Sequence, residues 1–378
     1  MKTATSLLLF SVLGLLVLGI VMLVSASMGQ PEARFLIMQP IWAGVGLVAC
    51  LAGAAIDYRW LKKFWWLFLG LAVVLLICVW IPHLGITKKG ASRWIGTAGF
   101  RLQPSEFAKI ALLIAVAWYG DRFQRFMPQF RRGILHPCLG VAVVLALIFK
   151  EPDVGTTALL AAVAGVMLLI AGARWLYVLP PVLLVAGGLA TFIALDPMRS
   201  DRVYAWLHPY ETRLDKGMQT WQSMAAFGSG GVQGVGLGEG RQKLGFVPEN
   251  HTDFILSIIG EELGLIATLS VLVAYLTILV CGTYIAWRAA DTFGMLLAAG
   301  ITFLIGLQAV INIGVVTGAL PNKGIALPFL SYGGSNLVLM LTCVGLLLSI
   351  ARHAPVPFAA AARRRDYETD ELAAPQTA

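Results

Sequence analysis

Residues 252–286 read TDFILSIIGEELGLIATLSVLVAYLTILVCGTYIA, and this stretch decides the fold class. No side chain in 263–286 is charged, and about 20 consecutive apolar residues are enough for a helix to cross the hydrocarbon core of a bilayer. The stretch therefore predicts a membrane-spanning helix. Asp253, Glu261 and Glu262 stand at its start, where ionisable groups are costly unless they form a pair or a site.

Further apolar runs lie on both sides of this stretch. The composition is 58% hydrophobic and 13% charged, against about 45–50% and about 25% in soluble domains. Despite a net charge of +8, this composition argues against a cytosolic enzyme and a nucleic-acid-binding protein. We expect an all-α polytopic membrane protein with about ten transmembrane helices, at residues 6–27, 37–56, 64–82, 104–120, 135–150, 155–173, 175–195, 252–286, 294–318 and 330–351.

The distribution of lysine and arginine predicts the orientation of the chain. Cytoplasmic connections carry an excess of these residues, and the short segments 57–63 and 121–134 are rich in them. We therefore expect both termini inside, with one large outer loop, 196–251, between the seventh and eighth helices. The first apolar run exceeds the about 7–15-residue core of a signal peptide, so it is interpreted as a retained anchor. Residues 1–352 form the membrane domain, and 353–378 are expected to be a disordered cytoplasmic tail.

Two outer segments are basic, although lysine and arginine are usually concentrated in the cytoplasmic connections. Residues 88–101 read KKGASRWIGTAGFR, and the long outer loop ends in RQKLGFVPENHTD at 241–253. An anionic ligand at the outer leaflet explains this charge most simply. The alternative is that the charges are only solvated in loops.

Asp253 is the first candidate for chemistry. The dipole at a helix N-terminus favours the ionised carboxylate, which can act as a general base or hold a cation. The alternative role is to cap the helix. Glu261 and Glu262 are expected to be structural, because each can hydrogen-bond another helix or a broken backbone.

Several cations can accompany this carboxylate. Glu106 and Lys109 are spaced i,i+3, which allows an ion pair, while the alternative is that Lys109 and Arg93 grip a phosphate. Lys323 adds a cation on the outer side, and the charges of the turn 150–155 can pair locally or line the same cavity.

Other cofactor motifs are not visible in the sequence. The five cysteines lie in or beside apolar runs and are odd in number, so we expect buried thiols and neither disulfides nor zinc. The five histidines lack metal-ligand spacing. The glycines of 228–240 are not a dinucleotide motif, because no strand–turn–helix unit surrounds them.

Five motifs stand in order along the chain: GASRWI at 90–95, QPSE at 103–106, EPDVGT at 151–156, VPENHTDF at 247–254 and SYGGS at 331–335. With them the chain resembles the SEDS family of peptidoglycan glycosyltransferases, the FtsW/RodA proteins, over roughly residues 6–352. GEGRQK at 238–243 and LPNKG at 320–324 are more similar to FtsW than to RodA. Asn250 and Asn336 depart from the family pattern without removing a charged residue.

The resemblance implies polymerisation of lipid II, the undecaprenyl-diphosphate-linked disaccharide pentapeptide, into glycan strands. The family's key acid falls on Asp253, which would take the proton of the acceptor's sugar 4-hydroxyl as the lipid diphosphate leaves with inversion. A single carboxylate suffices because diphosphate is a good leaving group once cations neutralise it. The expected substrate-binding residues are Arg93, Gln103, Glu106, Lys109, Arg241, Lys243, Glu249, His251, Lys323 and Ser331. A divalent cation, Mg²⁺ or Mn²⁺, is a further expectation without assigned ligands.

The expected partners are the growing lipid-linked strand, membrane lipid, a class B penicillin-binding protein that crosslinks the strands, and other divisome proteins. The expected location is the cytoplasmic membrane at the division septum, with the active site facing outward. Three alternatives stay open. The chain could be a RodA-type elongation polymerase, a flippase that moves lipid II across the membrane, or a non-catalytic divisome scaffold.

Overall fold

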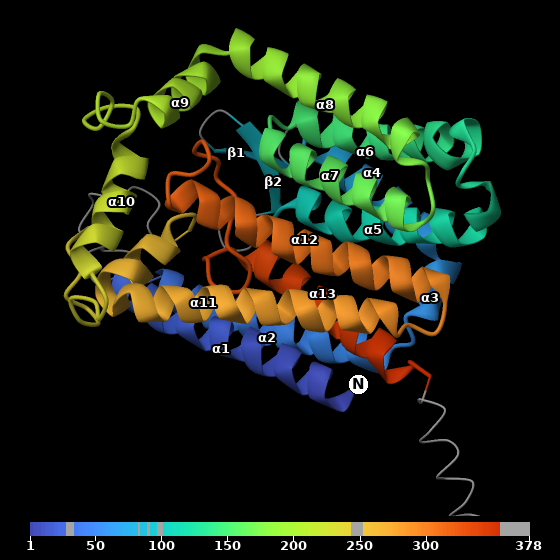
Figure 1. Cartoon of the computed structure of the whole chain (residues 1–378), viewed down its shortest axis with the longest axis horizontal. Helices are drawn as coiled ribbons and strands as arrows, with labels where there is room; N and C mark the ends of the chain where they lie inside the picture. The colour runs from blue at the N-terminus through green and yellow to red at the C-terminus, as the bar shows by residue number, and fades with distance from the viewer. Residues whose placement is uncertain (28–33, 82–83, 89–90, 97–100, 243–251, 356–378) are drawn as a thin grey trace, which may run out of the picture.

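The computed structural model describes residues 1–27, 34–81, 84–88, 91–96, 101–242 and 252–355 of the chain. In this part, long helices run side by side in one bundle (Figure 1). Each of the ten predicted spans falls on a helix, so the all-α polytopic fold is confirmed. These helices are α1 (Lys2–Ser27), α2 (Arg34–Ala55), α4 (Trp65–Cys78), α5 (Pro104–Arg122), α6 (His136–Lys150), α7 (Val154–Ile170), α8 (Trp175–Leu195), α11 (Ile255–Trp287), α12 (Thr292–Val316) and α13 (Gly334–Arg352).

The ten helices differ in how well they meet the length and polarity of a membrane span. Within the described residues, seven are long and apolar enough to cross a bilayer, while α4 and α7 are apolar but shorter. The remaining helix, α5, carries Glu106 and Lys109 in its first turns and ends in Asp121 and Arg122. Since charged side chains are expensive at membrane depth, α5 has to be surrounded by other helices.

Some elements were not predicted from the sequence. The basic outer segment folds into a three-stranded antiparallel sheet of order β1-β2-β3, in which Ile86 pairs with Trp94 and Ile95 with Leu102. The large outer loop contains two helices, α9 and α10, which Figure 1 shows at one end of the bundle. The added elements are α3 (Arg59–Lys63), η1 (Gln124–Phe126), η2 (Arg131–Leu135), α9 (Pro197–Leu207), α10 (Met218–Gly230), β1 (Gly85–Lys88), β2 (Ala91–Gly96) and β3 (Arg101–Leu102).

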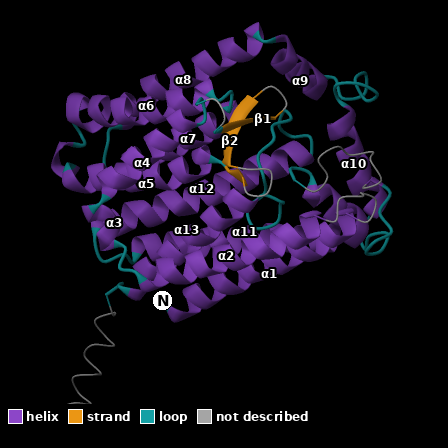
Figure 2. Ribbon diagram, turned by 180° about the vertical axis from the view of Figure 1, so that it is seen from behind, coloured by secondary structure: helices purple, strands orange, loops and turns teal. Residues whose placement is uncertain are grey.

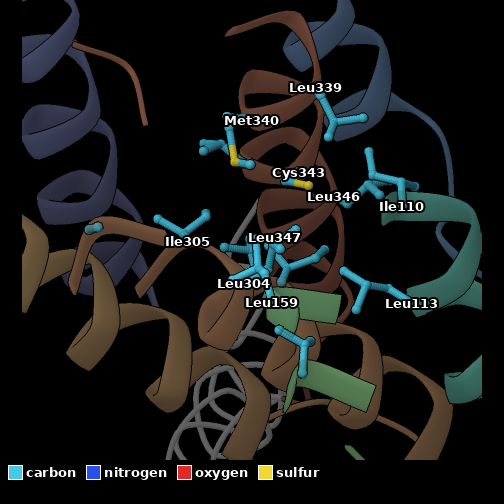
Figure 3. Close-up of a cluster of buried hydrophobic side chains, with 14 of the residues drawn as sticks. Ile110, Leu113, Leu159, Leu304, Ile305, Leu339, Met340, Cys343, Leu346 and Leu347 are labelled. Atoms are coloured by element: carbon cyan, nitrogen blue, oxygen red, sulfur yellow. The ribbon is translucent and has the colours of Figure 1, made fainter. Parts of the chain in front are cut away.

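The core lies around α12 and α13. In α13, 78% of the membrane span is buried inside the protein, against 6% in α8, which lies at the edge of the bundle. Figure 3 shows side chains from α5, α7 and α12 meeting α13, among them Leu113, Leu159, Leu304 and Cys343. All five cysteines are free: Cys50, Cys281 and Cys343 are buried, as expected, while Cys78 and Cys138 are only half-buried.

The two ends of the bundle carry different elements of the chain. Because the ten spans alternate in direction, the N-terminus, α3 and the end of α13 lie together at one end (Figures 1 and 2). The small sheet, α9, α10 and the start of α11 lie at the other end. The N-terminus and the end of α13 thus lie on one side, as the predicted orientation requires. The tail expected from residue 353 lies beyond the described residues from 356 onward.

Glycines allow α2 and α13 to approach closely. A Cβ atom at Gly345 would overlap the carbonyl oxygen of Cys50, and one at Gly46 would lie 2.6 Å from Leu341 Cδ1. Small residues at membrane helix interfaces permit this kind of backbone contact. Gly44, also on α2, has no atom within 4 Å of such a Cβ in the described structure.

We expect Gly345→Ala to destabilise the protein by about 1–3 kcal/mol, because the new methyl group forces two backbones apart. The matched variant Gly44→Ala should be neutral or stabilising by about 0.5–1 kcal/mol, since alanine is the better helix former. Thermal unfolding of the purified variants in detergent measures both effects. A Gly345→Ala melting temperature equal to that of Gly44→Ala would contradict the close packing of these helices.

Candidate active site

Asp253 lies in the turn that leads into α11. The helix begins at Ile255 with Phe254 at its N-cap position, so Asp253 precedes the cap. The side-chain amide of Asn312 on α12 donates to the Asp253 carbonyl oxygen at 2.8 Å and to the Ile325 carbonyl oxygen at 2.7 Å. Asn312 is 1% exposed, so its amide group is shielded from water. They fix the backbone of Asp253 against the segment 317–333.

The Asp253 carboxylate faces Gly324 of this segment. A Cβ atom at Gly324 would lie 2.6 Å from Asp253 Oδ2, which is closer than van der Waals contact allows. The absence of a side chain at Gly324 therefore leaves room for the carboxylate. Asp253 itself is half-buried, so its carboxylate lies at the boundary between the protein and its surroundings.

Lys323, the residue before Gly324, lies where three parts of the chain meet. Burial lowers its pKa, while the nearby Asp153 raises it and Arg199 lowers it. Asp153 caps the start of α7 through Thr156, and Arg199 of α9 pairs with Asp196 at 2.8 Å. The ammonium of Lys323 has thus lost water without full compensation, which is the condition under which an added anion binds favourably.

Arg93 connects the small sheet to the turn between α6 and α7. Its Nε donates to the Glu151 carbonyl oxygen at 2.9 Å and its Nη2 to the Pro152 carbonyl oxygen at 2.6 Å. These two contacts occupy part of its five N–H donors. The expectation that Arg93 grips a phosphate stays a prediction.

The carboxyl group of Glu151 lies buried beside this turn. The residue is 1% exposed, and neither of its side-chain oxygens has a hydrogen-bond partner in the described structure. Burial, and to a smaller extent the charge of Asp153, raise the pKa of Glu151 to about 8 against the opposing effect of Arg93. Glu151 is therefore largely protonated at neutral pH.

The ion pair between Glu106 and Lys109 is present and buried, with Lys109 Nζ 2.8 Å from Glu106 Oε1. Lys109 also lies 3.4 Å from Gln308 Oε1 of α12. The Gln308 amide donates to the Ala326 carbonyl oxygen at 2.8 Å and to Asn336 Oδ1 at 3.3 Å. A polar network thus connects α5, α12, α13 and the segment beside Asp253. Contact of Lys109 with a phosphate stays a prediction.

Gln103 and Ser331 lie in turns around this network. Gln103 donates through Nε2 to Ser105 Oγ at 3.0 Å, and its backbone N–H donates to Ser335 Oγ at 3.2 Å. Ser331 Oγ accepts the Leu327 N–H at 2.8 Å and is buried. The bond from the Gln103 N–H to Ser335 joins the starts of α5 and α13, whereas the side chains of Gln103 and Ser331 bond within their own turns.

Glu261 and Glu262 anchor the glycine-rich segment 231–242. Glu262 accepts hydrogen bonds from Ser25 of α1 and from the Gly238 N–H, while Glu261 accepts the N–H groups of Arg241 and Gln242. These contacts to another helix and to irregular backbone are of the kind expected from the sequence.

Glycine is required where the segment meets α11. A Cβ at Gly240 would lie 2.8 Å from Glu262 Oε1, and α11 itself is broken at Gly264, whose φ is 73°. The segment leaves Arg241 exposed at its end. Lys243, Glu249 and His251 lie outside the described residues.

The sequence reasoning missed Gln308, Asn312 and Gly324. Gln308 and Asn312 are spaced i,i+4 in the otherwise apolar run 294–318, and polar side chains in a span usually face the protein interior. That spacing was the available signal. Gly324 offers no comparable signal, because its role depends on the position of Asp253.

We expect the stability of the protein to fall as the pH rises from about 4.5 to about 8. The folded state keeps Glu151 protonated over this range, whereas the unfolded chain ionises it. The free energy of unfolding therefore falls by on the order of several kcal/mol. Glu151→Gln should remove much of this dependence, as measured by melting temperatures between pH 5 and pH 8.5. The matched variant Glu211→Gln, with a side chain 66% exposed, should retain it. Equal pH profiles for the two variants would contradict a buried, protonated Glu151.

Comparison with known proteins places these features in a family. The family model described as "Cell cycle protein", FTSW_RODA_SPOVE, matches residues 6–355. The "Probable peptidoglycan glycosyltransferase FtsW" of Geobacter metallireducens is 43% identical over 339 residues, covering 88% of this chain and 90% of that protein. The stage V sporulation protein E of Bacillus subtilis is 39% identical over 361 residues, covering 93% and 98%.

Solved structures agree with this assignment. A chain of a peptidoglycan synthase complex, whose structure concerns the coordination of polymerization and crosslinking, matches with a TM-score of 0.76 and 27% identity over 91% of this chain and 96% of that one. The rod shape determining protein RodA of Thermus thermophilus matches in fold, with a TM-score of 0.68 and 24% identity over 93% of this chain and 97% of that one. The chain belongs to the FtsW/RodA/SpoVE family of cell cycle proteins.

Proposed function

We propose that the chain is a peptidoglycan glycosyltransferase that polymerises lipid II at the outer face of the cytoplasmic membrane. The observation that carries the proposal is the Asp253 carboxylate, which is held against Gly324 at the end of the bundle that contains the basic segments. Relatives named as peptidoglycan glycosyltransferases are 41–43% identical over most of this chain, which supports the same activity here.

In this reaction Asp253 acts as the general base. The acceptor's sugar 4-hydroxyl attacks the anomeric carbon of the donor, a new C–O bond forms, and the bond from that carbon to the lipid diphosphate breaks with inversion. The hydroxyl proton passes to the Asp253 carboxylate and then to water. Because Asn312 fixes the backbone of Asp253, the carboxylate needs little reorganisation before it accepts the proton.

Cations at the same end of the bundle neutralise the leaving diphosphate. Lys323 is the best placed of the described residues, because its desolvated ammonium is adjacent in sequence to the glycine that contacts Asp253. Arg241 is exposed and Arg93 retains donors beyond its two backbone contacts. On the basis of the family resemblance, the substrate is also bound by Lys243, Glu249 and His251.

A divalent cation is compatible with this site as a companion of the substrate. The described residues contain no group of three or more His, Cys, Asp or Glu side chains that could hold a metal. Mg²⁺ is often bound by one or two carboxylates together with substrate phosphates, and Asp253 could supply one of them. Such an ion would neutralise the diphosphate, as Lys323 does.

The proposed partner is a class B penicillin-binding protein that crosslinks the new strands, together with other divisome proteins at the septum. The match to a chain of a peptidoglycan synthase complex supports a synthase partnership. The FtsW-named relatives support a role in division. The site then faces the periplasmic side, opposite the end that carries the N-terminus and the end of α13.

We expect Asp253→Asn to lower lipid II polymerisation by about 10²–10⁴-fold, because the amide cannot accept the proton. Gly324→Ala should cost up to about 10²-fold, because its methyl group displaces the carboxylate. Strand synthesis by purified protein with its cognate transpeptidase in detergent measures both effects. The matched controls are Asp215→Asn, at an exposed carboxylate, and Gly333→Ala, whose Cβ would lie 3.8 Å from its nearest neighbour.

The same assay separates the alternatives. A flippase needs two compartments, so it would form no strands in detergent, and a scaffold would still support growth with Asp253→Asn. Failure of strand synthesis together with growth of the Asp253→Asn strain would reject the polymerase.

Depletion of the protein from growing cells distinguishes division from elongation. We expect filaments, because septal wall synthesis stops while elongation continues. Rounding of rod-shaped cells would instead assign the chain to RodA-type elongation. Re-expression of the wild-type chain should restore the normal cell length, whereas Asp253→Asn should not.

A further inference from the structure

A groove lined by apolar side chains, with a volume of about 520 Å³, opens between α6, α7 and α8. Its wall on α6 runs from Ile134 in the preceding turn to Leu145, and its wall on α8 runs from Val178 to Val185. At about 1.5 Å per residue the α6 wall is about 16 Å long, about half of the roughly 30 Å hydrocarbon core. The groove therefore has the depth of one leaflet.

The position of α8 opens this groove to the membrane. Only 6% of its span is buried inside the protein, so the helix is covered mainly by lipid. Pro180 and Pro181 lie within the helix and line the groove. Their rings add apolar surface to this wall of the groove.

Arginines gather at one end of the groove. Arg131 and Arg132 lie in η2, directly before α6, and Arg174 is the N-cap residue of α8. All three are exposed. Among the described residues, no carboxylate oxygen lies within 4.0 Å of their guanidinium nitrogens. Asp121, at the end of α5, is paired with Lys62 at 2.6 Å.

Aromatic rings connect the arginines to the groove. The rings of Phe130 and Tyr177 lie 5.5 Å apart, edge to face, and the Arg174 guanidinium lies 6.0 Å from the Tyr177 ring centre. Phe130 also lines the groove. Aromatic and basic side chains of this kind are typical of the level at which lipid headgroups begin.

We propose that this groove binds one anionic phospholipid of the leaflet on the side of the N-terminus and the end of α13. One acyl chain fills the apolar groove, and the phosphate lies at Arg131, Arg132 and Arg174. A zwitterionic lipid could fill the same groove but would leave the cluster of positive charge uncompensated. Basic pockets between transmembrane helices on the cytoplasmic side bind anionic headgroups in this way. The site lies at the end of the bundle opposite Asp253.

The experiment counts lipids bound to the purified full-length protein by native mass spectrometry. Dioleoylphosphatidylglycerol is titrated against dioleoylphosphatidylcholine in mild detergent. We expect one tight phosphatidylglycerol adduct. Arg131→Gln/Arg174→Gln should bind it about 25-fold more weakly, about 5-fold for each arginine. The matched double variant Lys2→Gln/Lys63→Gln removes two charges at the same end but away from the groove, and should bind like the wild type.

A second variant tests the apolar part of the site. Ala142 of α6 lines the groove, so Ala142→Phe should weaken binding of both lipids by occupying the space of the acyl chain. Inorganic phosphate at the same concentration should not displace the adduct, because it lacks that chain. Unchanged melting temperatures of the variants establish that they are folded.

Three results would overturn the proposal. Equal binding of the two lipids would mean a groove without headgroup recognition. Equal loss in the two double variants would mean a diffuse attraction to charge. Displacement by inorganic phosphate would mean an anion site without a lipid chain. A loss confined to the arginine and Ala142 variants supports a phospholipid site.

Discussion

The side-chain amide of Asn312 holds the proposed catalytic region together. Its two hydrogen bonds join the start of α11, through Asp253, to the segment 317–333, through Ile325. One helical turn earlier, Gln308 joins the same segment to Lys109 of α5. In a dry interior such bonds are strong and costly to leave unmade. The start of α11, α12, the segment 317–333 and α5 are therefore fixed relative to one carboxylate.

The helical bundle was predictable because span length and apolarity are strong constraints in a membrane. The ten runs lie on ten helices, and even α5, with Glu106 and Lys109 in its first turns, forms as expected. The small sheet at 85–102 was not predicted. Its strands are short, and Lys, Gly and Ser are frequent in them, so they lack the alternating apolar pattern that marks a strand.

The features of the candidate site that depend on single side chains or on short sequence spacings could be predicted. The Glu106–Lys109 pair follows from an i,i+3 spacing, and the contacts of Glu261 and Glu262 follow from the cost of buried charge. The contact between Gly324 and Asp253 could not be predicted, because it depends on how two loops distant in sequence meet. The burial of Glu151 could not be predicted either, because its local sequence shows only a charged turn and its burial depends on distant parts of the chain.

The break at Gly264 divides α11 into two parts, the first of which directly follows Asp253, the proposed catalytic carboxylate. A straight helix of the 33 residues of α11 would be about 50 Å long, far more than the roughly 30 Å that the hydrocarbon requires. The residues at the start of α11 lie against α12, where Asn312 is 20 residues, or about 30 Å, from Thr292. A precursor anchored by its prenyl tail diffuses in the plane of the bilayer, with its sugars at a constant distance from the hydrocarbon core. An enzyme whose general base lies at the same distance from the hydrocarbon core can bind one anchored molecule after another while each prenyl tail stays in the bilayer.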